Sequence, residues 1–157
     1  MKREMKRSDR QVTDIKEIED IIKRCQVCRL AMIDGDEPYV VPLNFGYKDK
    51  TVYFHGALVG RKISVIEKNP SVCLEFDIAH KLITDEDTAC KWSQNYESVI
   101  AWGKGEILVD PHEKREAFNI IMGQYSEKKE WDYPDVVVER THIIKVPLER
   151  ITAKRFL

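Results

Sequence analysis

The sequence predicts a mainly β domain of the α+β class, and three observations carry this prediction. Six or seven short apolar runs with strand-like composition are separated by turn residues or by a few helices. The first of these runs follow one another closely enough to pair in antiparallel order. Gly103 and Gly105 interrupt a long later run, as glycines do where a strand bulges or bends at a barrel corner. Together these features favour a closed barrel.

Three segments carry the periodicity or the boundary signals of helices. The first begins at a capping box formed by Asp14 and Glu17 and continues with isoleucines at helical spacing. The second opens with Arg61 and stops at an Asn-Pro pair, and the third starts at Pro111 and carries an apolar side. The expected helices are therefore 14–24, 61–68 and 111–122.

The expected strands lie between these helices and are bounded by turn residues. They cover residues 27–33, 39–47, 51–55, 71–78, 98–109, 142–146 and 151–154. We expect the first three to form an antiparallel meander, and Pro42 interrupts the second of them. The polar segment 79–95 is expected to be a long loop, and the charged segment 126–139 to be irregular. The barrel would then be closed near this loop by an excursion of the chain or by a partner.

Composition indicates one folded domain over residues 1–157 rather than a disordered chain, with 43% hydrophobic and 34% charged residues. The net charge of −1 argues against a general nucleic-acid binder, which would show a basic excess. The basic segment Met1–Arg10 has no apolar core, so it has the character of neither a signal peptide nor a membrane anchor. No apolar run reaches transmembrane length, and we expect a cytoplasmic protein without a membrane partner.

The cysteines are Cys25, Cys28, Cys73 and Cys90, of which the first two form an isolated C-x-x-C. A zinc site would need two more ligands at matching spacing, and the other cysteines and the histidines are scattered. A thioredoxin-type pair lies between a strand and the next helix, whereas this pair follows a helix and precedes a strand. We therefore interpret Cys25 and Cys28 as small buried apolar residues and expect no metal site.

Residues 53–62 hold the strongest functional signal. A β-like run ends at His55 and Gly56, a short loop containing Gly60 follows, and Arg61 and Lys62 open a helix. Two cations are unusual there, because the helix dipole favours negative charge at its N-terminus. Together with free backbone N–H groups they indicate an anion site, for which phosphate is the simplest ligand. The alternative is a solvated Arg-Lys pair that starts a surface helix.

A second signal lies in residues 39–45. Pro42 removes a ladder donor from an apolar strand, so it belongs at a sheet edge or beside a ligand, and Asn44 offers both donors and an acceptor. A flat heteroaromatic ring fits along such an edge, while the alternative is an ordinary edge strand in which Pro42 blocks aggregation. Because the two runs lie one hairpin apart, they predict a ligand with a ring and a phosphate, such as flavin mononucleotide (FMN).

Several motifs occur in a characteristic order: CRLAM at 28–32, PYVVPLNFGY at 38–47, YFHGA at 53–57 with GRK at 60–62, NPSVC at 69–73 and SVIAWGKG at 98–105. Because of these ordered motifs, the sequence resembles the FMN-binding split-barrel superfamily that includes the pyridoxamine 5′-phosphate oxidases. Within this superfamily it is most similar to the 5-nitroimidazole-resistance branch. The resemblance covers about residues 8–125. It implies a six-stranded antiparallel split β-barrel with flanking helices, and a homodimer with two flavins between the subunits.

The resemblance also implies roles for individual residues. Arg61 and Lys62 would hold the FMN phosphate, and His55 would lie near the ring and the ribityl chain. Trp92 would cover the flavin face or pack at the subunit interface, and Ser98 falls where the oxidases usually have a flavin-contacting glutamine. The implied cofactor-binding set is Val40, Val41, Pro42, Leu43, Asn44, His55, Gly56, Ala57, Gly60, Arg61, Lys62, Trp92 and Ser98.

The oxidases' C-terminal signature for pyridoxal phosphate is a Trp followed by an Arg-x-His element. Arg140-Thr141-His142 lacks the spacer residue and context of that element, so pyridoxamine phosphate is not expected as a substrate. A flavin would carry the electrons, and His55 is the candidate catalytic acid because its pKa can place a proton donor at neutral pH. The alternative, a histidine that only contacts the ligand, is favoured because no second catalytic partner is visible.

Three functions follow as hypotheses. The first is an FMN-dependent reductase of small electrophiles such as 5-nitroimidazoles, which converts a nitro group to an amine. The second is a non-catalytic flavin-binding protein that serves another redox protein. The third is a haem-handling protein that uses His80, His112 or His142. FAD is the alternative cofactor.

Overall fold

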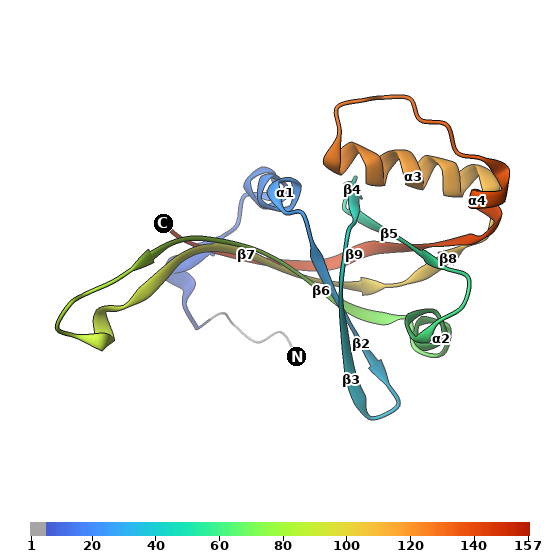
Figure 1. The fold of residues 1–157 in the computed structure, drawn as a ribbon. Coiled ribbons are helices and arrows are strands. Elements are labelled where there is room, and N and C mark those ends of the chain that lie inside the picture. The colour runs from blue at the N-terminus through green and yellow to red at the C-terminus, as the bar shows by residue number, and fades with distance from the viewer. Residues whose placement is uncertain (1–5) are drawn as a thin grey trace.

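Residues 6–157, which the computed structural model describes, form a mainly antiparallel β structure with four α-helices around it (Figure 1). The first half of the basic segment Met1–Arg10 therefore lies outside the described residues. The helices are α1 (Ile15–Arg24), α2 (Arg61–Lys68), α3 (Pro111–Tyr125) and α4 (Asp135–Glu139). The strands are β1 (Gln11–Val12), β2 (Cys28–Asp34), β3 (Glu37–Leu43), β4 (Gly46–Lys48), β5 (Thr51–Ala57), β6 (Ser71–Ile83), β7 (Ser93–Lys104), β8 (Glu106–Leu108) and β9 (Thr141–Phe156).

The long strand β9 joins the two halves of the sheet. The strand order is β3-β2-β6-β7-β9-β5-β4, and β1 and β8 also pair with β9. The C-terminal part of β9 pairs with β7, while residues 141–147 pair with β5. The register between β7 and β9 shifts between Trp102 and Gly103, which confirms the bulge that the glycine predicts. Among the described residues the strand order is open between β3 and β4, and the arrangement is the split barrel that the resemblance implies.

The predicted strand 39–47 and the predicted meander are wrong. This run forms two strands, because the chain leaves the β2–β3 hairpin at Asn44 and crosses to pair with β5 as β4. Phe45 is fully buried at the crossing, and its N–H donates to the hydroxyl of Tyr125 at 2.9 Å instead of to a neighbouring strand. At Gly46 a Cβ atom would lie 2.6 Å from the backbone of Ile121 in α3, so only glycine allows β4 to pass there.

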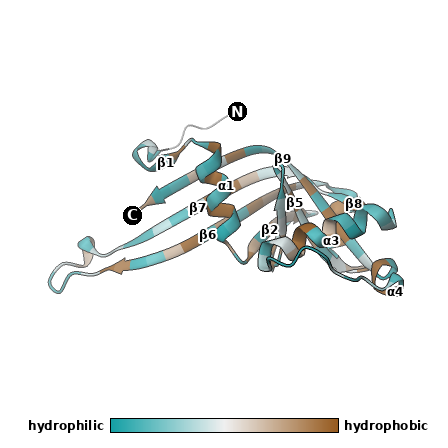
Figure 2. Cartoon of the chain, turned by 90° about the horizontal axis from the view of Figure 1, so that it is seen from above, coloured by the Kyte–Doolittle hydropathy of each residue, from teal (hydrophilic) through white to brown (hydrophobic). Residues whose placement is uncertain are grey.

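The predicted loop 79–95 is also wrong, because β6 and β7 continue through most of it as a hairpin arm. The arm stands clear of the rest of the sheet (Figures 1 and 2). Asp85 organises its tip, where its carboxylate accepts the N–H of Thr88 at 2.7 Å and its carbonyl accepts the indole N–H of Trp92 at 2.7 Å. The arm has no buried face along most of its length, so its sequence lacks the alternation that marks half-buried strands.

Toward the C-terminus, the two predicted strands form the single strand β9, and the segment expected to be irregular contains α4. The helix predictions for α1 and α2 are confirmed, and α3 continues to Tyr125. Asp14 caps α1 through the N–H of Lys16 at 2.8 Å, rather than through that of Glu17 as the capping box predicts.

Apolar side chains pack on both sides of the β5–β9 pair. The main core, inside the barrel, includes the fully buried Phe45, Phe54 and Phe76. A second cluster under α3 contains Leu108, Ala117, Ile121 and Ile143. No helix among the described residues is long and apolar enough to cross a membrane.

The interpretation of the C-x-x-C pair as buried apolar residues is confirmed. Cys25 and Cys28 are both free thiols with at most 4% exposure. Burial raises the pKa of Cys25 to about 11, so the reactive thiolate is disfavoured. Within residues 6–157, no group of three metal-ligating side chains comes together.

Candidate functional site

An open pocket of about 440 Å³ unites the two runs that carry the functional signals in the sequence. The end of β3 and the residue after it form one wall, and the end of β5 forms another. Lys62 enters from the first turn of α2, and the chain at the start of β9 completes the lining. The lining residues are Pro42, Leu43, Asn44, His55, Gly56, Ala57, Lys62, Arg140 and Thr141.

Antiparallel pairing with β9 places the end of β5 at this pocket. Gly56 lies opposite His142 and Ala57 lies opposite Thr141 in the register. A Cβ atom on Gly56 would lie 2.8 Å from Cε and 3.0 Å from Nζ of Lys62, so the lysine chain passes over the glycine. The absent side chain at Gly56 therefore lets the ammonium of Lys62 approach the strand.

His55 keeps an exposed side chain at the pocket wall. Partial burial and the nearby Lys62 ammonium both lower its pKa from the ordinary value of 6.5. The imidazole of the free protein is therefore neutral at pH 7, and it offers one donor and one acceptor rather than a positive charge.

Arg61 lies outside this pocket and is engaged elsewhere. Its guanidinium donates to Asp34 and to Glu37, each at 2.8 Å, and it lies over the ring of Tyr39 at 4.4 Å. These contacts fasten the start of α2 to the β2–β3 turn. Lys62 is thus the member of the predicted cation pair that lines the pocket, and the assignment of Arg61 to a phosphate stays a prediction.

Strand β3 provides the polar sheet edge that Pro42 predicts. It ends the strand order and, among the described residues, pairs only with β2. Pro42 lies opposite Arg29 and has no N–H, so it cannot donate a ladder hydrogen bond in this edge strand. Val40 is 59% exposed, whereas the side chain of Val41 packs on the main core.

The other residues of the implied cofactor set lie outside the pocket. Gly60 precedes α2 as its N-cap with φ of 149°, a conformation that glycine adopts readily. Ser98 lies between Asp77 and Lys154 on neighbouring strands. Trp92 is 51% exposed beside the tip of the hairpin arm. Within one chain, the structure therefore does not bring Trp92 or Ser98 to the pocket.

The sequence analysis missed Arg140 and Thr141 as pocket residues. They follow α4, in a segment whose sequence shows no helix or strand periodicity. In the sequence, residues 140–142 served only as an incomplete match to the oxidases' pyridoxal-phosphate signature. Only the pairing of β9 with β5 brings them beside Gly56 and Ala57.

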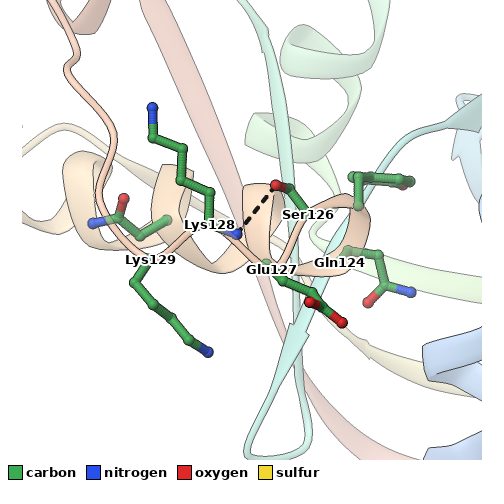
Figure 3. Close-up of a pocket in the computed structure, with 8 residues that line it drawn as sticks. Gln124, Ser126, Glu127, Lys128 and Lys129 are labelled. Carbon is green, nitrogen blue, oxygen red and sulfur yellow. Dashed lines mark hydrogen bonds between the residues drawn. The ribbon is translucent and has the colours of Figure 1, made fainter.

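A larger hollow of about 770 Å³ lies at the C-terminal end of α3 (Figure 3). The ammonium groups of Lys128 and Lys129 extend in opposite directions, as Figure 3 shows, so they do not converge on one ligand. Lys128 lies over the ring of Trp131, and Gln124 donates to three backbone carbonyls around the end of α1. These groups serve the fold, and the pocket at Lys62 remains the candidate site.

Comparison with known proteins identifies the family. The family model described as pyridoxamine 5′-phosphate oxidase matches residues 14–155. The chain belongs to this family. The resemblance stated from the sequence motifs is thereby confirmed, and the split barrel is the fold that the family shares with this chain.

Solved structures agree with this assignment. A candidate 5-nitroimidazole antibiotic resistance protein from Bacteroides thetaiotaomicron is 36% identical, with a TM-score of 0.83 over 92% of this chain and 85% of that chain. The flavocytochrome Anf3 from Azotobacter vinelandii shares the fold at 18% identity, with a TM-score of 0.87 over 98% and 72% of the two chains. The FAD and haem binding protein from Mycobacterium smegmatis does so at 12% identity, with a TM-score of 0.84 over 93% and 73%. No curated protein matches the chain.

Proposed function

We propose that this protein binds FMN in the pocket at Lys62 and acts as a reductase of small electrophiles such as 5-nitroimidazoles. The observation that carries the proposal is the pocket itself, which joins a polar strand edge to a cationic end. The ring would lie along the free edge of β3 near Pro42 and Asn44. The phosphate would lie at the end lined by Gly56 and Lys62.

The residues present fit such a ligand. Lys62 forms no ion pair with a carboxylate among the residues that the structure describes, although it is half-buried. An unpaired half-buried ammonium is costly, and a bound anion would satisfy it. Members of this fold described as FAD-binding support the flavin class, with FAD as the alternative cofactor.

A bound flavin would supply the electrons, and this chain would position it. Conversion of a nitro group to an amine takes up electrons and protons in several steps and releases water, so an external donor must reduce the flavin repeatedly. The neutral His55 would donate a hydrogen bond to the flavin or the substrate. The resistance protein at 36% identity supports nitroimidazoles as the substrate class.

A haem function has less support, because the three candidate histidines are apart. His80 contacts Glu97 at 3.0 Å, His112 is 81% exposed beside Glu116, and His142 lies in β9. A non-catalytic flavin-binding protein remains the alternative that experiment must separate from a reductase.

We also propose a homodimer. Alternate residues of β2, β6, β7 and β9 face away from the main core and form an outer face with no partner in the described chain. Ala31, Cys73 and Trp102 are neighbours across this face, and Ile100 is 38% exposed on it. The face continues to Val40 on β3, so a second copy seated there would also cover the flavin edge.

The test begins with the absorbance spectrum of the purified protein. Flavin bands, with FMN as the flavin released on denaturation, are expected, whereas a Soret band would indicate haem. The protein would then be reduced with dithionite without oxygen and mixed with a 5-nitroimidazole. Reoxidation of the flavin is expected, and the amine should form once the flavin has been reduced repeatedly. Flavin that is bound but never reoxidised by the nitroimidazole would favour the non-catalytic alternative.

A further inference from the structure

Two cationic residues line the candidate pocket, and they come from distant parts of the chain. Lys62 lies in the first turn of α2, and Arg140 follows α4. Neither is in an ion pair within residues 6–157, whereas Arg61, the neighbour of Lys62, is held by Asp34 and Glu37. Two unpaired cations lining one pocket repel each other unless an anion lies between them.

The backbone that carries Arg140 is fastened on both sides. Lys114 of α3 is only 5% exposed, and its ammonium donates to the carbonyl of Val138 in the last turn of α4 at 3.2 Å. Arg115, the next residue, donates to the carbonyl of Tyr133 at 2.6 Å and pairs with Asp135. The hydroxyl of Thr141 donates to the carbonyl of Val137 at 2.8 Å.

A simpler explanation for a cation at position 140 is that it stabilises the C-terminal end of α4. A cation after a helix can serve the helix dipole alone. Here the buried ammonium of Lys114 already occupies the C-terminal end of α4, and this helix has only five residues. Arg140 is therefore not needed for the helix dipole, and it lines the pocket without an ion-pair partner in the described residues.

We propose that Arg140 is the second phosphate ligand of the site, and that the phosphate is held between Lys62 and Arg140 rather than between Arg61 and Lys62. A phosphate monoester carries close to two negative charges at neutral pH, which two cations neutralise. The planar guanidinium can donate to two phosphate oxygens side by side, which a lysine cannot. The inference rests on the proposed flavin function.

The decisive experiment compares FMN with riboflavin, which has the same ring and ribityl chain but no phosphate. The affinity of the full-length apoprotein for each is measured by flavin fluorescence quenching. For Arg140→Gln we expect FMN affinity to fall about 10- to 100-fold, as expected for loss of charge-assisted hydrogen bonds. Riboflavin affinity should stay within about twofold, because it is bound without this contact. Arg140→Lys should restore part of the FMN affinity.

Riboflavin binding also serves as the folding control for every variant. Lys68→Gln, at the far end of the same helix as Lys62, is the matched charge control and should change neither affinity. The proposal is overturned if Arg140→Gln weakens FMN and riboflavin equally, or if Arg61→Gln alone causes the phosphate-specific loss. A wild-type protein that binds neither flavin would instead overturn the proposed function, and the inference with it.

Discussion

At the scale of single residues, the buried carboxylate of Glu97 lies outside the pocket and has three hydrogen-bond partners. This carboxylate is 3% exposed and accepts from Arg24 at 2.7 Å, from Arg155 at 2.8 Å and from His80 at 3.0 Å. The partners come from α1, β9 and β6, so one carboxylate joins three elements at the base of the hairpin arm. The hydrogen bond from Arg24, followed by those from His80 and Arg155, lowers the pKa of Glu97 from 4.5 to about 2, against the opposing effect of burial.

This lowered pKa predicts a pH-dependent contribution to stability. Because the folded state favours the ionised form, the contribution is present above pH 4.5 and is lost as the pH falls toward 2. Glu97→Gln should lower the free energy of unfolding by roughly 2–3 kcal/mol at pH 7, measured by urea denaturation. The deficit should shrink as the pH falls from about 4.5 to about 2, where the wild-type carboxylate is itself protonated.

Glu106→Gln is the matched control, because that carboxylate is 56% exposed and pairs with Lys145 at 3.7 Å in the other half of the sheet. Its effect should stay below about 1 kcal/mol, as for other surface pairs. An equal loss at pH 7 in both variants would contradict the special role of Glu97.

A second prediction at this scale concerns His55. Its lowered pKa leaves it neutral at pH 7, which favours a hydrogen-bonding contact over a role as the proton donor. His55→Asn should therefore retain FMN and slow reoxidation of the reduced protein by a nitroimidazole less than about tenfold in stopped flow, below the range for loss of a general acid. A loss of about 10²–10⁴-fold with flavin fully bound would make His55 the catalytic acid.

At the scale of elements, α3 supports the pocket from both ends. Its N-terminal half holds α4 and thereby Arg140 through Lys114 and Arg115. At its C-terminal end, the hydroxyl of Tyr125 accepts the N–H of Phe45 at 2.9 Å and donates to the carbonyl of Gln26 at 2.8 Å. The side-chain amide of the pocket residue Asn44 donates to the same carbonyl at 3.2 Å, so Tyr125 and Asn44 are both hydrogen-bonded to Gln26.

Tyr125→Phe should therefore affect both stability and ligand binding. The backbone N–H of the fully buried Phe45 would lose its partner, which costs about 1–3 kcal/mol of unfolding free energy. We expect a lower urea midpoint together with weaker FMN binding, because the wall at Asn44 loses its support. Tyr133→Phe removes an exposed hydrogen bond to Asn119 and should change stability by less than about 0.5 kcal/mol. Equal effects of the two substitutions would argue against the proposed anchoring.

At the scale of the whole molecule, the outer face of the sheet is the feature that a single chain leaves unexplained. Its residues lie across four strands and reach the edge strand of the pocket. Ser98 of the implied cofactor set lies on one of these strands, and Trp92 lies on the arm that continues from them. We propose that Trp92 and Ser98 contact the flavin that is bound by the second copy of the chain.

Ile100→Glu tests this proposal, since it places a charge in the middle of the outer face. The wild type should behave as a dimer in light scattering, and the variant should shift toward monomer and lose flavin together with thermal stability. Val109→Glu changes a residue that is 74% exposed between β8 and α3, and it should remain dimeric with flavin bound. A wild-type monomer that keeps its full flavin content would contradict the dimer.

The sequence by itself determined the features that depend on neighbouring residues. Isoleucine periodicity with a capping aspartate identified α1, and the cation pair with the Asn-Pro stop identified α2. The two pocket runs, 42–44 and 55–57 with Lys62, were also visible, because each combines unusual residues within one short segment. The ordered motifs sufficed to indicate the family, because several short runs in a fixed order are far more specific than any one of them.

Only the tertiary structure decided which of these segments meet. The break of 39–47 into two strands depends on the hydroxyl of Tyr125 and on the close approach of α3 at Gly46, both far away in the sequence. The arm forms a hairpin without the alternation that marks half-buried strands in a sequence. Arg140 reaches the pocket through pairing of β9 with β5, and Arg61 turns to Asp34 and Glu37. Sequence patterns record local preference, whereas these outcomes are set by non-local packing and charge pairing, which no local pattern contains.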